Sequence, residues 1–119
     1  MKFNNDIPIY LQLIGLFKDK ILKGEWKADE RIPSVRDLAV EYGVNPNTVQ
    51  RALAELEQEG FLRSERTLGR FVQANDSSLE KLKREEINDI SKSFIMKMKA
   101  VGMNKENTIK IISDNWEDV

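Results

Sequence analysis

Two short helix patterns joined by a tight turn lie in the middle of the chain and constrain its fold more than any other feature. Ser34 and Asp37 have the spacing of a capping box at the start of a helix. Gly43 can adopt the left-handed conformation that ends a helix. Asn45 then supplies a second cap oxygen, and Pro46 fixes φ at the first position of a new helix. This order predicts a helix-turn-helix.

The second helix of this pair has a buried face and an exposed N-terminal face. Apolar side chains recur at helical spacing at Val49, Ala52, Leu53 and Leu56. The side chains left outside are Asn47, Thr48, Gln50 and Arg51. They either form a solvated surface or contact bases and phosphates in a DNA major groove. Because Asn and Gln can pair with adenine through two hydrogen bonds, they favour sites that contain A·T pairs.

A β-hairpin is expected directly after the second helix, which Gly60 ends. Residues 61–66 have strand composition, residues 67–69 form a turn, and Phe71 and Val72 lie on the return strand. The arginines of this segment are Arg63, Arg66 and Arg70. They are either ordinary solvated charges of the strands or a phosphate-binding surface beside the second helix. The hairpin completes the pattern of a winged helix-turn-helix.

An amphipathic helix is also expected before this pair, from the Pro8 entry to Gly24. Its apolar positions are Tyr10, Leu13, Ile14, Phe17, Ile21 and Leu22. Residues 25–30 read as a connector. Arg31 and Ile32 then form a short strand that pairs with the hairpin.

The composition changes after residue 75 to a long, charged, amphipathic pattern. This change predicts two domains, residues 1–75 and residues 76–119. Ser77 and Glu80 have capping-box spacing, and the apolar positions of the helix that follows are Leu79, Leu82, Ile87, Ile90, Phe94, Met98 and Val101. Gly102 ends this helix, and Asn104 can cap a second one. The tail is therefore expected to form an antiparallel helical hairpin.

Two helices cannot bury so much apolar surface by themselves, so we expect a second copy of the chain to cover it. The predicted interface residues are Leu82, Ile87, Ile90, Phe94, Met98, Ile109, Ile112 and Trp116. A twofold pair would also place two recognition helices one DNA turn apart. The alternatives for these apolar residues are an intramolecular core and an effector pocket.

Composition excludes several classes of protein. The 119 residues include neither cysteine nor histidine, so the usual zinc ligands and the usual general base are missing, and we expect no metal, no cofactor and no enzymatic activity. Basic and acidic residues nearly balance, at 19 against 20, so any affinity for DNA depends on local placement. The sequence has neither a secretory signal nor a membrane-spanning run, which predicts the cytoplasm.

At this point the chain resembles the GntR family of bacterial transcription regulators. The resemblance rests on Pro8, Tyr10 and Gln12, on Ile32 to Ala39, on Val44 to Leu53, and on Gly69 to Val72. The tail is similar to that of the YtrA subfamily, whose two C-terminal helices dimerise. The chain departs from the family at Pro46, where many members carry a basic residue, at Gln50, where some do, and at Thr67 and Asp29, where glycine is usual.

The resemblance implies a fold that is mainly α with a small β-hairpin (α+β), a winged helix-turn-helix followed by a helical hairpin. It implies a homodimeric repressor that binds a palindromic DNA operator, with transporter genes as the regulated genes. The expected DNA-binding residues are Ser34, Arg36, Asn45, Asn47, Thr48, Gln50, Arg51, Arg66, Thr67, Gly69 and Arg70. For Arg36 the alternative is a surface ion pair, and for Asn45 it is helix capping alone. A winged helix that binds a protein partner instead of DNA is the alternative function.

Overall fold

The computed structural model describes residues 2–73 and 77–119, without the side chains of Ser77 and Ser78. The predicted domain boundary after residue 75 and the predicted Ser77 cap lie outside the described residues, so both stay predictions. The chain separates into two compact units, Met1–Lys81 and Leu82–Val119.

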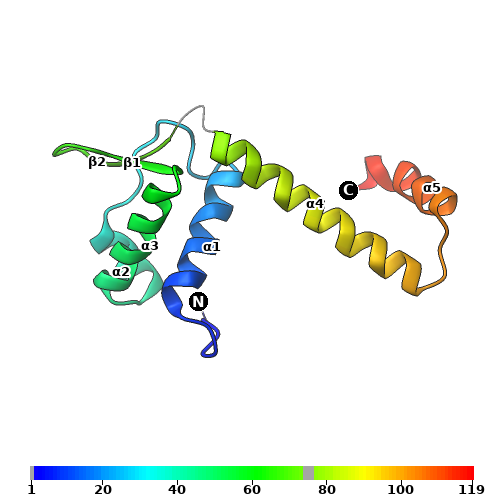
Figure 1. Ribbon diagram of the computed structural model, residues 1–119, viewed down its shortest axis with the longest axis horizontal. Helices are drawn as coiled ribbons and strands as arrows, with labels where there is room; N and C mark the ends of the chain where they lie inside the picture. The colour runs from blue at the N-terminus through cyan, green and yellow to red at the C-terminus, as the bar shows by residue number, and fades with distance from the viewer. Residues whose placement is uncertain (1, 74–76) are drawn as a thin grey trace. The chain divides into compact units, whose positions relative to one another are not determined.

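The first unit is a helical core with a β-hairpin at its edge. Helices α1 (Ile9–Leu22), α2 (Val35–Tyr42) and α3 (Pro46–Gln58) precede the antiparallel strands β1 (Leu62–Glu65) and β2 (Gly69–Val72), as Figure 1 shows. The order of elements is that of a winged helix-turn-helix. The predicted class, mainly α with a small β-hairpin, is confirmed.

The core of this unit lies between α1 and α3. The buried side chains of α1 are Leu13, Ile14, Phe17 and Ile21. Those of α3 are Val49, Ala52, Leu53 and Leu56, as their spacing predicts. Full burial of a side chain such as Phe17 contributes about 1.5 to 3 kcal/mol to the free energy of unfolding. Tyr10 and Leu22, which also belong to the predicted stripe, are only half-buried.

Trp26 is part of the core, although the sequence suggested only a connector there. Its backbone N–H donates to the Lys20 carbonyl at 3.0 Å, after a turn in which Gly24 has a φ of 76°. The turn brings the indole back onto Phe17, with ring centroids 5.1 Å apart. Residues 25–30 do connect α1 to the next elements, as expected, but the sequence did not show that Trp26 is buried, because a tertiary contact decides it.

The hairpin pairs Leu62 with Val72 and Glu65 with Gly69. Gly69 is thus the first residue of β2, whereas the sequence placed it in the turn. The predicted third strand is an isolated antiparallel bridge between Arg31 and Phe71. The pairing does not continue along the chain, because Pro33, two residues after Arg31, has no backbone N–H to donate.

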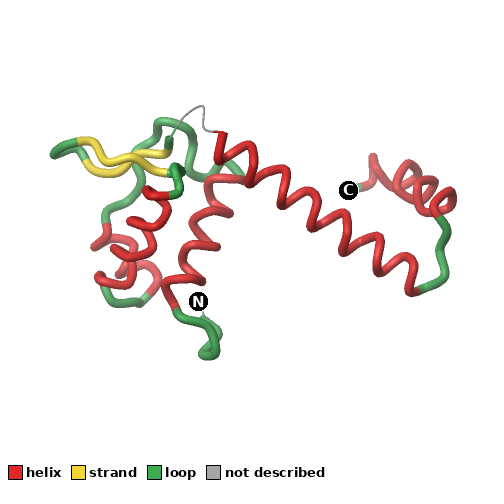
Figure 2. Tube along the Cα trace, viewed as in Figure 1, coloured by secondary structure: helices red, strands yellow, loops and turns green. Residues whose placement is uncertain are grey.

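The rest of the chain is helical, with α4 (Ser77–Ala100), α5 (Lys105–Asn115) and the short 3-10 helix η1 (Trp116–Asp118) (Figure 2). The Asn104 side-chain oxygen accepts a hydrogen bond from the backbone N–H of Asn107 at 2.8 Å, so the predicted cap of α5 is confirmed.

The apolar sides of α4 and α5 remain open to solvent in the single chain. Ile109 on α5 is 52% exposed, and Trp116, the first residue of η1, is 71% exposed. Side chains of both helices, among them Phe94 and Met98, line a groove of about 600 Å³. The two helices therefore do not bury their own apolar surface. None of the helices in the described residues is long and apolar enough to cross a membrane.

We expect Thr67→Asn to stabilise the protein. Thr67 has a φ of 65°, a left-handed conformation that β-branched residues adopt at a cost of about 1 to 2 kcal/mol and that Asn tolerates better. Urea denaturation should show a rise of about 0.5 to 1 kcal/mol in the free energy of unfolding. Thr67→Val is the matched control, since it keeps the branched Cβ, and an equal rise in both variants would contradict the explanation.

Candidate nucleic-acid interface

Local capping chemistry sets the positions of α2 and α3. The Ser34 hydroxyl oxygen accepts a hydrogen bond from the backbone N–H of Asp37 at 3.1 Å, which starts α2. Gly43, with a φ of 65°, ends it. The Asn45 side-chain oxygen then accepts from the backbone N–H of Asn47 at 2.8 Å, with Pro46 in the first turn of α3. Both predicted caps are confirmed.

The first turns of α3 present polar side chains to solvent. Asn45, Asn47, Gln50 and Arg51 are exposed, and Thr48 is half-buried. The opposite face of the helix is sealed in the core, so these side chains form the accessible edge. The exposed edge has the size and the mixed donor and acceptor chemistry needed to contact base edges in a major groove.

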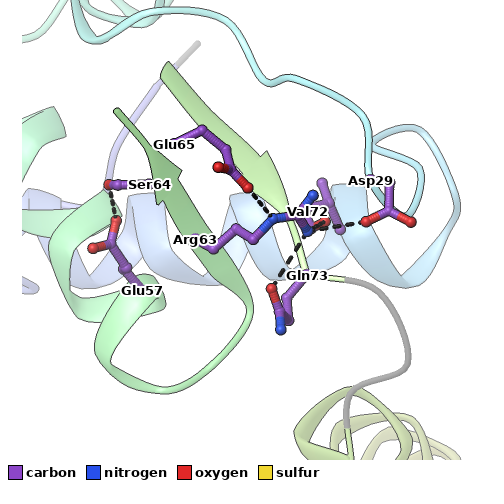
Figure 3. Close-up of polar contacts among 7 residues, drawn as sticks. All are labelled: Asp29, Glu57, Arg63, Ser64, Glu65, Val72 and Gln73. Atoms are coloured by element: carbon purple, nitrogen blue, oxygen red, sulfur yellow. Dashed lines mark hydrogen bonds and ion pairs between the residues drawn. The ribbon is translucent and has the colours of Figure 1, made fainter. Parts of the chain in front are cut away.

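Arg63 is a structural residue of the hairpin. Its Nε lies 2.8 Å from a Glu65 carboxylate oxygen, and its Nη1 lies 3.0 Å from an oxygen of Asp29. The same nitrogen donates to the Val72 carbonyl at 3.1 Å, and Figure 3 shows these partners around one guanidinium. The hydrogen bond to Glu65 is the main reason why the pKa of Arg63 is raised, and Asp29 adds to it.

Arg70 joins the hairpin to α3 on the other face of the sheet. Its Nε lies 3.2 Å from a Glu57 carboxylate oxygen, and its Nη1 donates to the side-chain oxygen of Gln50 at 3.1 Å. The Ser64 hydroxyl also donates to Glu57, at 2.6 Å (Figure 3). The side chain of Arg70 is only 18% exposed. A contact between Arg70 and a phosphate stays a prediction.

Two other predicted arginines have no such partners. Among the residues that the structure describes, neither Arg36 nor Arg66 makes an ion pair or a side-chain hydrogen bond, and both are exposed. Since no carboxylate of the described residues pairs with these two arginines, their guanidinium groups are available for an external anion. The surface ion pair considered for Arg36 is absent from this described part of the chain.

Arg51 stacks on an aromatic ring that the sequence analysis did not place in the site. Its guanidinium carbon lies 3.7 Å from the ring centroid of Tyr10 on α1. A stacked guanidinium keeps its N–H groups at the edge of the ring plane, so it can still donate to a phosphate. Nearby, the Gln12 amide nitrogen donates to the carbonyls of Asn4 and Ile7 at 2.7 and 2.8 Å. These contacts tie the segment before α1 to the helix.

Arg31 is a further candidate that sequence analysis missed. It is exposed, and a Cβ placed on Gly69 would lie 3.1 Å from its Nε, so its side chain runs along the hairpin. A hollow of about 200 Å³ separates this side chain from the start of α2, and Ser34 and Arg70 also line it. Arg31 lies three residues before the helix cap Ser34, and a basic residue so close to a helix start could have suggested this position.

Comparison with known proteins gives a consistent result. Residues 9–72 match the family model described as bacterial regulatory proteins, gntR family. The HTH-type transcriptional repressor YtrA of Bacillus subtilis (strain 168) is 35% identical over 113 residues, which covers 94% of this chain and 87% of YtrA.

Solved structures agree with the sequence matches. A GntR family transcriptional regulator from Listeria monocytogenes has a TM-score of 0.76 and 32% identity, covering 94% of this chain and 98% of its own. The AraR DNA-binding domain in complex with operator ORX1 has a TM-score of 0.54 and 30% identity, covering 56% of this chain and 80% of its own. The proteins of this family that the chain resembles are transcription regulators rather than enzymes.

Arg63→Ala should lower the midpoint of thermal unfolding, because it leaves Asp29 and Glu65 without their shared cation. Arg66→Ala should leave the midpoint unchanged, since no intramolecular partner is lost among the described residues. Circular dichroism melts of both variants make the comparison. An equal midpoint in Arg63→Ala and the unmodified protein would show that the Arg63 contacts do not stabilise the hairpin.

Proposed function

The chain belongs to the gntR family of bacterial regulatory proteins and is a sequence-specific DNA-binding transcription regulator, and on this premise we propose that it acts as a homodimeric repressor. Each subunit inserts the first turns of α3 into a major groove of a twofold-symmetric operator. Occupation of promoter DNA then blocks transcription. Its DNA target puts the protein in the cytoplasm, and the resemblance to YtrA-like regulators suggests transporter genes as targets.

One observation carries the proposal: the N-terminal edge of α3 is exposed while its other face is buried. Asn47 and Gln50 lie on this edge, one helical turn apart, so both can reach base edges in the same groove. Asn45 uses its side-chain oxygen for capping, which leaves its amide nitrogen for a phosphate or a base. The likeness to an operator-bound DNA-binding domain supports this arrangement.

The contacts to the DNA backbone come from the elements on either side of α3. Arg36 on α2 and Arg66 at the tip of the hairpin supply charge that no partner among the described residues neutralises. Arg51, on its Tyr10 platform, reaches a phosphate beside the recognition helix. The turn residue Thr67 and Gly69, the first residue of β2, approach the minor groove.

The start of α2 adds a second kind of phosphate contact. Ser34 lies in the hollow beside Arg31, at the start of α2, where the positive end of the helix dipole favours an anion. We therefore add Arg31 to the residues that hold the DNA backbone.

The second copy of the chain covers the apolar sides of α4 and α5. Phe94, Ile112 and Trp116 line an open apolar hollow of about 510 Å³, and the groove between the helices adds Met98 and Ile109. Apolar surface of this extent is expected at a protein interface. A twofold partner would bury it and set the spacing between the two recognition helices.

Arg36→Ala and Arg66→Ala should each weaken operator binding and lower the salt dependence of the binding constant by about one unit of slope. Fluorescence anisotropy titrations over a range of salt concentrations, on fragments selected from the host genome, measure both quantities. Lys110→Ala on α5 is the control and should leave the slope unchanged. Affinity and slope that stay the same in both arginine variants would refute the proposed backbone contacts.

Substitution of Phe94 and Trp116 together by serine should convert the dimer to a monomer, since both apolar side chains leave the proposed interface. Sedimentation velocity measures the change. Met96→Ser is the matched control, because Met96 is 71% exposed but lies on the opposite side of α4 from Phe94. A double variant that still sediments as a dimer would place the interface elsewhere.

A further inference from the structure

The contact between Arg70 and Gln50 gives the recognition helix a property that its sequence does not reveal. Gln50 is exposed on α3, whereas Arg70 lies on β2 and is largely covered. The Arg70 Nη1 donates to the side-chain oxygen of Gln50 at 3.1 Å, while the Arg70 Nε binds Glu57 at 3.2 Å. Gln50 and Glu57 are two helical turns apart on one face of α3. One guanidinium therefore spans both side chains.

The chemistry of arginine decides which end of the Gln50 amide faces the hairpin. A guanidinium group has only donors, so it can accept nothing from the amide NH₂ group. The oxygen of Gln50 must point to Arg70, and the NH₂ group must point away from it. Glu57 keeps Arg70 in place, and Glu57 is itself held by the Ser64 hydroxyl at 2.6 Å. The orientation of Gln50 is thus fixed by a chain of contacts from both strands.

We propose that Arg70 is a positioning residue that makes Gln50 a hydrogen-bond donor in the major groove, so that Gln50 selects guanine or thymine rather than adenine. This inference rests on the proposed insertion of α3 into the groove. Bidentate pairing with adenine needs both the oxygen and the nitrogen of the amide directed at the base, and here the oxygen is held by the hairpin.

The base edges explain the expected order of preference. Guanine presents two adjacent acceptors, N7 and O6, and thymine presents O4. Adenine offers only one acceptor, N7, and its adjacent N6 amino group is a donor that cannot accept from the NH₂ group of Gln50, as is the N4 amino group of cytosine. Guanine therefore ranks first and thymine second. The general preference of glutamine for adenine, expected from the sequence, does not hold for a residue clamped in this way.

The test compares the DNA sequences that the full chain and its variants select from a randomised duplex library. Gln50→Ala identifies the base position that Gln50 contacts, because the preference there is lost. At that position the unmodified protein should prefer guanine or thymine. Arg70→Lys keeps a cation for Glu57 but cannot span both Glu57 and Gln50, so it releases the amide. We expect the preference for guanine over adenine to fall by about five- to tenfold.

The lysine substitution also separates positioning from a plain phosphate contact. A phosphate contact would tolerate lysine and would leave the base preference unchanged. Arg63→Lys is the matched control, since Arg63 lies on the opposite face of the hairpin and pairs with Asp29 and Glu65. It should not alter the preference at the Gln50 position. Circular dichroism establishes that each variant is folded.

The outcomes distinguish the inference from the function on which it rests. Enrichment of a defined site by the unmodified protein, with adenine preferred at the Gln50 position, would overturn the inference and leave the proposed function intact. The same follows if Arg70→Lys selects the same bases as the unmodified protein. If no sequence is enriched at any salt concentration, the proposed function itself fails and the inference fails with it.

Discussion

The burial of one face of α3 is the constraint on which the other features depend. Val49, Leu53 and Leu56 are almost fully removed from solvent against α1 and the hairpin. Rotation of the helix by a quarter turn would expose these side chains, at about 1.5 to 3 kcal/mol for each. The packing of the core therefore determines which residues of α3 remain accessible, and the Asn45 cap determines where that accessible edge begins.

The hairpin and α3 form one surface because the Arg70 side chain connects them. Arg63 holds one face of the hairpin to the loop at Asp29, and Arg70 holds the other face to Glu57. Such partly exposed ion pairs each contribute little to stability. Their main consequence is geometric, since they fix the direction of side chains on the proposed DNA-binding surface.

The sequence predicted those features that depend on neighbours in the chain. The Ser34 and Asn45 caps, the left-handed Gly43 and the buried face of α3 follow from local chemistry and helical spacing. Contacts between residues far apart in the chain could not be predicted from it. Trp26 is buried only because a turn returns it to Phe17.

The same limit explains what was missed in the candidate site. All three hairpin arginines looked alike in the sequence, because the partners that distinguish them, Asp29 and Glu57, come from other segments. Thr67 could be recognised as an exception to a glycine pattern, but only the backbone shows that it keeps the left-handed conformation. The stacking of Arg51 on Tyr10 was likewise missed, because it depends on the packing of α1 beside α3.

Methylation interference at guanine N7 tests most directly whether the exposed edge of α3 lies in the major groove, since N7 is accessible only there. The measurement uses duplex fragments bound by the full chain. We expect interference in two clusters about one helical turn, or a multiple of it, apart, one for each subunit. A bound duplex on which major-groove methylation has no effect would contradict the account.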